Sequence, residues 1–208
     1  MNKLQIILAS QSIGRKRLLK QVGIVFKSHS SGYDEDMSAY KSPKKLATFL
    51  ALGKAAFITS KFPNCIIIGA DTFITLGRAK IGKPKSIPNA HKIISSMSGK
   101  TIQVHSGVAV LRTNAQGEII KTVTEHVVTK LKIKTMSPQE IQLLATQKNV
   151  LKISGAFSIE GPGGKMIQKI DGKPFNSQQP KPTNAYSNVI GLPTSTLQKM
   201  LKKVKGID

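Results

Sequence analysis

The chain has 208 residues, 39% apolar and 20% charged, which is enough for one domain with a buried core and excludes an overall disordered chain. Lysine and arginine number 32 against 10 acidic residues, so the formal net charge is +22. A surface this basic favours anionic partners but does not by itself identify one.

The cysteine content and the apolar runs bear on the cell compartment. Cys65 is the single cysteine, which excludes a disulfide within the chain, and its apolar surroundings predict a buried small residue. No run approaches the ~18 apolar residues of a membrane span. The apolar stretch Leu4–Ala9 is too short for a secretory signal. We therefore expect a soluble, cytoplasmic protein with no membrane contact.

The N-terminal part alternates short apolar runs with helical patterns. Gly23 is placed to end a first, basic helix, and Ser42 with Pro43 is a favourable start for a second helix. Asp71 follows a buried apolar run. The predicted elements are a strand over Leu4–Ala9, a helix over Ser12–Gln21, a helix over Pro43–Thr59 and a strand over Cys65–Ala70.

The rest of the chain continues this alternation of strands and helices. The predicted elements are a helix over Pro88–Met97, hairpin strands over Thr101–Arg112 and Ile119–Lys134, a helix opened by a capping box at Ser137–Glu140, and a helix over Thr194–Val204. Gly172–Asn184 is rich in proline and polar residues, which predicts a surface insertion. The alternation favours an α/β or α+β fold, and the length favours a single domain over 1–208.

Acidic residues are informative because they are scarce. Asp71 is expected at the end of the Cys65–Ala70 strand, where α/β proteins build sites. There it could bind a divalent cation or deprotonate water, or equally serve as a helix cap or turn former. Asp34, Glu35 and Asp36 form an acidic loop that, without further context, is a solvated surface.

Basic and hydroxyl side chains supply candidate phosphate ligands. Ser10 and Ser12 lie between a predicted strand and a helix, where backbone N–H groups and the helix dipole favour phosphate, and Arg15 could clamp it. Ser12 is equally a plain helix cap. Lys54 lies in an apolar helix, and Lys83 lies between a glycine and a proline. Any single lysine of this chain could also belong to a solvated face.

Several other classes of site lack their signatures. The four histidines have no short ligand spacing and no cysteine partners, so a zinc centre is not expected. There is no nucleophile-elbow motif and no zinc finger. Aromatic residues make up only 5% of the chain, so specific nucleic-acid binding is not expected.

Taken together, these segments resemble the Maf family of nucleoside triphosphate pyrophosphatases, the septum-formation inhibitor proteins. The resemblance runs nearly end to end, and the order and spacing of the motifs make it specific. The matching motifs are Leu8–Leu19, Asp34-Glu35, Leu52–Ala55, Ile68–Thr72, Gly82–Pro84, Met97–Thr101, His105–Ala109, Gly155–Phe157, Ile159–Gly161 and Tyr186–Pro193.

The resemblance implies a single α/β domain with a mixed, twisted sheet, flanking helices and a deep nucleotide cleft. It implies a homodimer, and hydrolysis of a nucleoside triphosphate to monophosphate and pyrophosphate with Mg²⁺ or Mn²⁺. It also implies removal of non-standard nucleotides and a link to cell-division arrest. Asp71 would accept the proton, and Glu35 and Asp71 would hold the metal. The residues implied to bind the substrate are Ser10, Ser12, Arg15, Lys54, Thr72, Lys83 and Glu160.

The chain departs from the family pattern in ways that bear on the base. Ile13 and Gly14 replace the usual proline and first arginine, and Gly172–Asn184 is inserted. Glu160 stands where pyrimidine-type members have glutamine, whereas Thr72 is typical of that type and not of the 7-methyl-GTP type. Preference for dTTP and UTP or for 7-methyl-GTP therefore stays open. The alternative is a catalytically weak relative that binds nucleotides or nucleic acid through its charge.

Overall fold

The computed structural model describes residues 4–178 and 183–206. Its strands are β1 (Gln5–Leu8), β2 (Lys27–Ser28), β3 (Cys65–Leu76), β4 (Ala79–Ile81), β5 (Thr101–Thr113), β6 (Ile119–Ile133), β7 (Ile167–Ile170) and β8 (Lys173–Pro174). Its α-helices are α1 (Ile13–Gln21), α2 (Pro43–Ala56), α3 (Ile87–Met97), α4 (Pro138–Ala145), α5 (Asn184–Ile190) and α6 (Thr194–Lys205). Four 3₁₀ helices are η1 (Thr59–Lys61), η2 (Val150–Lys152), η3 (Ser154–Ala156) and η4 (Gly161–Met166).

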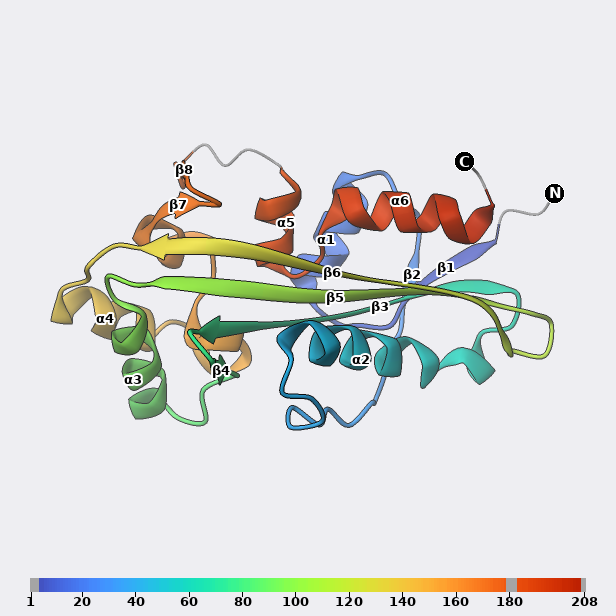
Figure 1. The fold of residues 1–208 in the computed structure, drawn as a ribbon, viewed down its shortest axis with the longest axis horizontal. Coiled ribbons are helices and arrows are strands. Elements are labelled where there is room, and N and C mark those ends of the chain that lie inside the picture. Colours follow the sequence, from blue (N-terminus) through green and yellow to red (C-terminus); the bar gives the residue numbers. More distant parts are fainter. Residues whose placement is uncertain (1–3, 179–182, 207–208) are drawn as a thin grey trace. The chain divides into compact units, whose positions relative to one another are not determined.

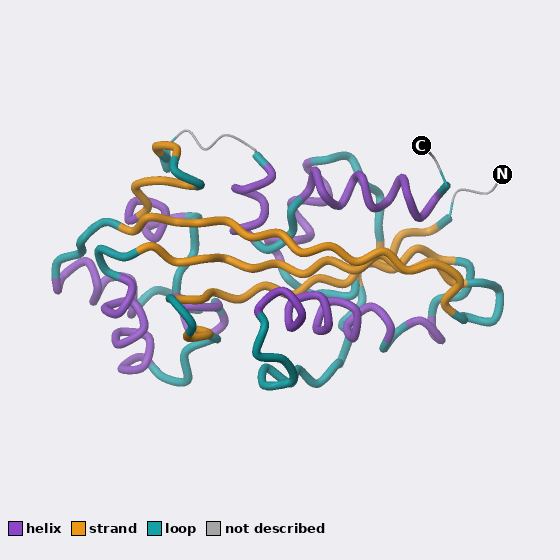
Figure 2. The backbone as a smooth tube through the Cα atoms, viewed as in Figure 1, coloured by secondary structure: helices purple, strands orange, loops and turns teal. Residues whose placement is uncertain are grey.

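The strands form one mixed sheet in the order β2-β1-β3-β5-β6-β7-β8, with β4 paired to β3 (Figure 1). β1 is parallel to both β2 and β3, whereas the pairs β3–β4, β6–β7 and β7–β8 are antiparallel. Helices flank the strands (Figure 2). This arrangement confirms the predicted α/β class with a mixed sheet and flanking helices.

The chain packs into two compact units. Unit 1 comprises Met1–Asp71, Ser106–Val127 and Gly191–Asp208, and unit 2 comprises Thr72–His105 and Val128–Ile190. The long strands β3, β5 and β6 contribute residues to both units. The extent of a single domain over 1–208 and the deep nucleotide cleft stay predictions.

In unit 1, α2 lies directly against the backbone of the sheet. A Cβ atom added at Gly69 of β3 would overlap the Ala51 carbonyl oxygen, and one added at Gly107 of β5 would overlap that of Ala47. Ala51 and Ala55 share a buried cluster with alternate residues of the strands. α1 and α6 cover the opposite side of these strands (Figure 1). Small side chains on both surfaces therefore set how closely α2 approaches the sheet.

Unit 2 has its own core. Apolar residues of β3, β5, β6 and β7 pack with α3, α4 and the turns around Ala156 and Phe157. Asn188 of α5 is buried, and its amide nitrogen donates to the Val104 carbonyl at 3.2 Å and to Thr129 Oγ1 at 2.9 Å. These bonds tie α5 to β5 and β6.

Most predicted elements are confirmed, and two boundaries are wrong. The helix expected over Pro43–Thr59 ends at Ala56, because the Ile58 N–H bonds to the Ala55 carbonyl three residues back and tightens the last turn. The strand expected over Cys65–Ala70 continues to Leu76, because β4 pairs with its second half.

The Gly172–Asn184 segment contains more regular structure than its composition indicates. Lys173 and Pro174 form β8, and Asn184 begins α5. The Phe175 ring stacks with Tyr186 at a centroid distance of 6.2 Å. Positions 179–182 lie outside the described residues. That this segment is an insertion stays a prediction.

No helix within residues 4–178 and 183–206 combines the length and the apolar run that crossing a membrane requires.

Candidate functional site

Asp71 lies within β3 and not at its end, which corrects the sequence-based expectation. Side chains alternate between the two faces of a strand, so Asp71 points to the same face as Gly69, the face that α2 covers. Only 4% of the residue is exposed. A buried carboxylate requires a compensating charge or hydrogen-bond donors, and α2 supplies one.

Lys54, in the last turn of α2, is the partner of Asp71. Its Nζ lies 2.5 Å from Asp71 Oδ1 and 2.9 Å from Glu35 Oε1. The exposed fractions of the side chains are 9% for Lys54, 6% for Asp71 and 39% for Glu35. Because residues 51, 54 and 55 share one face of the helix, the contact of α2 with Gly69 also aims Lys54 at Asp71. Three separate segments thus supply the three groups of this cluster, an ammonium between two carboxylates.

The acidic loop contributes one of its three carboxylates to this cluster. Glu35 reaches Lys54, whereas Asp36 Oδ1 accepts hydrogen bonds from the Ser38 N–H at 2.8 Å and the Ser38 hydroxyl at 2.5 Å. Asp34 is exposed. The loop is therefore more than a solvated surface, because Asp36 closes a turn that follows the site residue Glu35.

Arg15, at the start of α1, is anchored beside this cluster. Its Nε donates to the Gly191 carbonyl at 2.9 Å, and its Nη1 donates to Ser10 Oγ at 3.2 Å. Burial lowers the pKa of the Arg15 guanidinium, and the negative charges of Asp71 and Glu35 oppose that shift. The electrostatic interaction places Arg15 in the same charged environment as the two carboxylates.

Ser10 and Ser12 organise the turn between β1 and α1. Ser12 Oγ accepts from the Arg15 N–H at 3.4 Å as the helix cap, and Ser10 Oγ accepts from the Ser12 N–H at 3.2 Å. The plain capping role considered for Ser12 is thus present. The structure brings together six of the predicted site residues in unit 1: Ser10, Ser12, Arg15, Glu35, Lys54 and Asp71.

The chemistry of Glu35 and Asp71 fits a hard divalent cation. Both carboxylates contact the Lys54 ammonium nitrogen, so the two acidic side chains converge on one position that already attracts a cation. Mg²⁺ in phosphate-handling sites is usually held by one or two carboxylates together with substrate oxygens and water, at about 2.0–2.1 Å. Among the described residues no group of three or more acidic, histidine or cysteine side chains is placed to hold a metal ion.

The other three predicted site residues belong to unit 2. The Thr72 carbonyl accepts from the Ser154 hydroxyl at 3.2 Å, and the Glu160 N–H donates to the Ser158 hydroxyl at 3.2 Å. Lys83 is exposed in the loop after β4, where the Gly82 carbonyl accepts from the Gly155 N–H at 2.8 Å. Their roles toward a substrate stay predictions.

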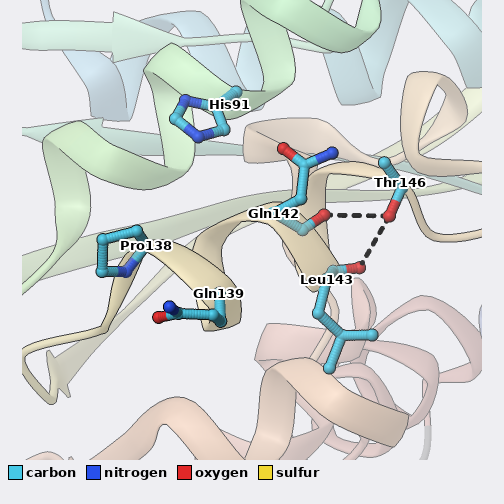
Figure 3. Close-up of a pocket in the computed structure, with 6 residues that line it drawn as sticks. All are labelled: His91, Pro138, Gln139, Gln142, Leu143 and Thr146. Atoms are coloured by element: carbon cyan, nitrogen blue, oxygen red, sulfur yellow. Dashed lines mark hydrogen bonds between the residues drawn. The ribbon is translucent and has the colours of Figure 1, made fainter.

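A surface pocket of unit 2 shares no residue with these candidates. It lies at α3 and α4 and is lined by His91, Pro138, Gln139, Gln142, Leu143 and Thr146 (Figure 3). Thr146, which follows α4, donates from Oγ1 to the carbonyls of Gln142 and Leu143 in that helix (Figure 3). The pocket lining has no lysine, arginine or carboxylate, so it lacks the charged groups that a triphosphate requires.

One contributor to the site was missed by the sequence analysis. The Gly191 carbonyl fixes the Arg15 side chain, but the two residues are 176 positions apart in the sequence. Gly191 lies within the matching motif Tyr186–Pro193, which was the available signal. Neither composition nor local periodicity indicates its contact with Arg15.

Comparisons with known proteins agree with the resemblance to the Maf family. A family model described as Maf-like protein matches residues 5–178. A "dTTP/UTP pyrophosphatase" of Bacillus thuringiensis subsp. konkukian (strain 97-27) is 33% identical over 199 residues, 96% of this chain and 95% of the relative. The enzyme of the same name from Bacillus cereus (strain ATCC 10987 / NRS 248) is 33% identical over 202 residues, 97% of this chain and 91% of the relative.

A solved structure supports the fold at lower sequence identity. The structure titled "Structure of a HAM1 protein from Coxiella burnetii" superposes with a TM-score of 0.52 at 15% identity. The match covers 97% of this chain and 100% of that chain. At this identity the likeness shows the fold alone.

Proposed function

The chain belongs to the Maf-like protein family, and from this premise we propose that it is a nucleoside triphosphate pyrophosphatase. It hydrolyses a nucleoside triphosphate between the α- and β-phosphates and releases a nucleoside monophosphate and pyrophosphate. The observation that carries the proposal is the buried contact of Lys54 with Asp71, joined by Glu35. Hydrolysis of this bond requires an oriented water and charge neutralisation more than a covalent nucleophile.

Asp71 is the proposed general base. The water oxygen forms a bond to the α-phosphorus, the bond to the bridging oxygen breaks, and pyrophosphate leaves with the electron pair of that bond. The proton of the water passes to the Asp71 carboxylate. The Lys54 ammonium compensates the charge of this buried base before the reaction. The Asp71 carboxylate can therefore be buried in an otherwise apolar contact between helix and sheet.

Basic groups near the base are proposed to hold the triphosphate. Arg15, fixed by Ser10 and Gly191, offers a pre-oriented guanidinium, and the Ser10–Ser12 turn precedes the N-terminus of α1. Lys83 is proposed as a further phosphate ligand. Glu35 and Asp71 are the groups that would hold Mg²⁺ or Mn²⁺. When bound, such an ion neutralises phosphate charge.

Glu160 and Thr72 are the proposed determinants of base preference. An ionised carboxylate only accepts hydrogen bonds, so Glu160 favours the paired donors of guanine, as in the 7-methyl-GTP type. Thr72 matches the pyrimidine type, and the two relatives are named for dTTP and UTP. We propose a relaxed preference for the base. Pyrimidine nucleotides are hydrolysed, and Glu160 lowers kcat/KM for them relative to guanine nucleotides.

The direct test is pyrophosphate release from a panel of dTTP, UTP, GTP and 7-methyl-GTP in the presence of Mg²⁺. Pyrophosphate must appear in equal amount with the monophosphate, and Asp71→Asn must lower its release at least about 100-fold. Release of inorganic phosphate instead, or undiminished release by folded Asp71→Asn, would contradict the proposal.

The net charge of +22 favours a second candidate function. A catalytically weak relative could bind nucleotides or nucleic acid through this charge, with an affinity that falls steeply as salt increases. Salt-sensitive binding of a DNA duplex without turnover of any nucleotide in the panel would favour this alternative over the enzyme.

Four family-level expectations belong to the same proposal: a homodimer, a cytoplasmic location, removal of non-standard nucleotides and a link to cell-division arrest. Light scattering of the purified chain tests the first. Pyrophosphate release from nucleotides with modified bases tests the third.

A further inference from the structure

Gly53 is an unexpected residue in the interior of α2. Glycine is a poor helix former, second only to proline, because it loses more backbone freedom on folding than other residues. Gly53 lies inside a regular helix, so no left-handed backbone conformation requires glycine there. An interior glycine of this kind indicates a close approach by another group.

The approaching group is the side chain of Tyr33. A Cβ atom added at Gly53 would overlap Tyr33 Cζ and lie 2.7 Å from Tyr33 Oη. The Tyr33 ring also meets the Phe57 ring edge to face, at a centroid distance of 6.1 Å and an interplanar angle of 67°. Phe57 follows Gly53 by one helical turn, so the Tyr33 ring occupies the surface of α2 that a residue-53 side chain would cover.

This contact lies next to the charged cluster along both segments. Tyr33 precedes Glu35 by two residues, and Gly53 immediately precedes Lys54. The Glu35 side chain is 39% exposed and comes from a segment without regular secondary structure. A glutamate in such a setting has many accessible rotamers, so holding its carboxylate 2.9 Å from Lys54 requires its backbone to be fixed nearby.

We propose that Tyr33 is a positioning residue: seated on Gly53, its ring fixes the 33–36 segment against α2 so that Glu35 reaches Lys54. The turn that Asp36 closes with Ser38 fixes the other end of the segment. Tyr33 therefore acts on the site through Glu35 and does not itself touch the reacting atoms. Two experiments test this role. The measurement of activity rests on the proposed function, whereas the measurement of hydrogen exchange does not.

The first arm measures hydrogen exchange of the peptide covering residues 33–40 by mass spectrometry. Tyr33→Ala removes the ring, Gly53→Ala displaces it, and Tyr33→Phe keeps it. We expect at least tenfold faster exchange in Tyr33→Ala and Gly53→Ala and wild-type exchange in Tyr33→Phe. Gly53→Ala should not lower the melting temperature, because alanine is the better helix former. Wild-type exchange in both altered proteins would overturn the proposal.

The second arm is a double-mutant cycle on pyrophosphate release, with kcat and KM measured separately. Tyr33→Ala should lower kcat/KM about tenfold in the wild-type background and have no further effect in Glu35→Gln. Tyr40→Ala is the matched control, since Tyr40 meets Phe49 of α2 at the same 67° angle but lies beyond the Asp36 turn. Wild-type kcat/KM is expected for this control.

The two arms separate the two proposals. An equal loss from Tyr33→Ala in both backgrounds shows that Tyr33 does not act through Glu35 and overturns the positioning role while leaving the enzyme proposal intact. A wild-type protein that releases no pyrophosphate overturns the enzyme proposal. The exchange arm then still decides the positioning role.

Discussion

The Lys54 ammonium lies 2.5 Å from the Asp71 carboxylate, and both side chains are more than nine-tenths buried. The contact joins the last turn of α2 to the middle of β3 and is therefore part of the packing of unit 1 as well as of the candidate site. Changes at either residue should affect stability and activity together. Exposed site residues should affect activity alone.

Asp71→Asn tests the general base. The amide cannot accept the proton of water, so we expect turnover to fall at least about 100-fold. The amide oxygen still accepts from Lys54, and Glu35 still faces the ammonium, so the free energy of unfolding should fall by about 2–3 kcal/mol. Pyrophosphate release and urea denaturation check the two effects. A folded variant with near-normal turnover contradicts the assignment.

Lys54→Met keeps the length of the side chain and removes its charge. The Asp71 and Glu35 carboxylates are then left together without the ammonium, and we expect a loss of about 3 kcal/mol in the free energy of unfolding. We also expect kcat/KM to fall at least about tenfold. Lys202→Met, on the exposed face of α6, is the control and should change stability by at most about 0.5 kcal/mol. Equal effects at both positions would show that only general charge matters.

Lys83→Met tests a phosphate ligand that carries no packing role. Lys83 is exposed, so the melting temperature should stay within about 2 °C of wild type. Loss of one charged contact to phosphate should raise KM for dTTP roughly tenfold, equivalent to about 1.4 kcal/mol. The control is Lys92→Met, exposed on α3 of the same unit. A matching rise in KM for the control would remove Lys83 from the site.

Glu160→Gln tests the reading of the base. Uracil and thymine present one donor between two acceptors, so a carboxylate leaves one oxygen facing another oxygen, whereas an amide can also donate. We expect the ratio of kcat/KM for dTTP over GTP to rise about tenfold or more. The two specificity constants are measured in parallel on both proteins. If the ratio does not move, Glu160 does not contact the base.

Glu140→Gln tests the pH dependence of stability. The Glu140 carboxylate accepts from Lys134 Nζ at 2.7 Å and from the Ser137 N–H at 2.8 Å, and these bonds lower its pKa below the ordinary value. A lowered pKa in the folded state means stabilisation that is complete above the unfolded-state pKa and is lost as the pH falls through the folded-state value.

Thermal denaturation of wild type and Glu140→Gln across pH 3–7 measures this stabilisation. We expect wild type to melt higher at pH 7 and the difference to shrink once the pH falls below about 4.3, the pKa of glutamate in an unfolded chain. A difference that stays constant down to pH 3 would show that the Glu140 charge does not contribute.

Local sequence signals predicted the hairpin and the α-helices of the described residues except α5, which the sequence analysis did not predict. Ser42 with Pro43, and Ser137 with Glu140, are caps whose side chains satisfy backbone groups within three residues, so the sequence itself specifies these starts. The end of β3 depended on β4, a three-residue strand with no pattern of its own. A pairing partner, not propensity, decided where that strand ended.

The candidate site, like the fold, could be predicted only in part. Asp71 could be selected because acidic residues are scarce, Glu35 from the order of the motifs, and Lys54 from its apolar helix. The structure brings the three together. Their mutual geometry could not be predicted, because it depends on Gly69 meeting Ala51 and on Tyr33 covering Gly53. Contacts of this kind join residues far apart in the sequence, and a glycine is the only feature of the sequence that marks each of them.

The close contact of α2 with Gly69 and Gly107 has a consequence for which substitutions the protein can tolerate. Where two backbones touch, the spacing between a helix and a sheet is fixed by covalent geometry and not by the sizes of core side chains. Substitutions that repack the apolar residues elsewhere in unit 1 can then accumulate while the acid–base pair keeps its separation. A single methyl group at either glycine would push the helix, and with it the ammonium, away from the carboxylate. Two positions that carry no side chain thus restrict which substitutions leave the site intact.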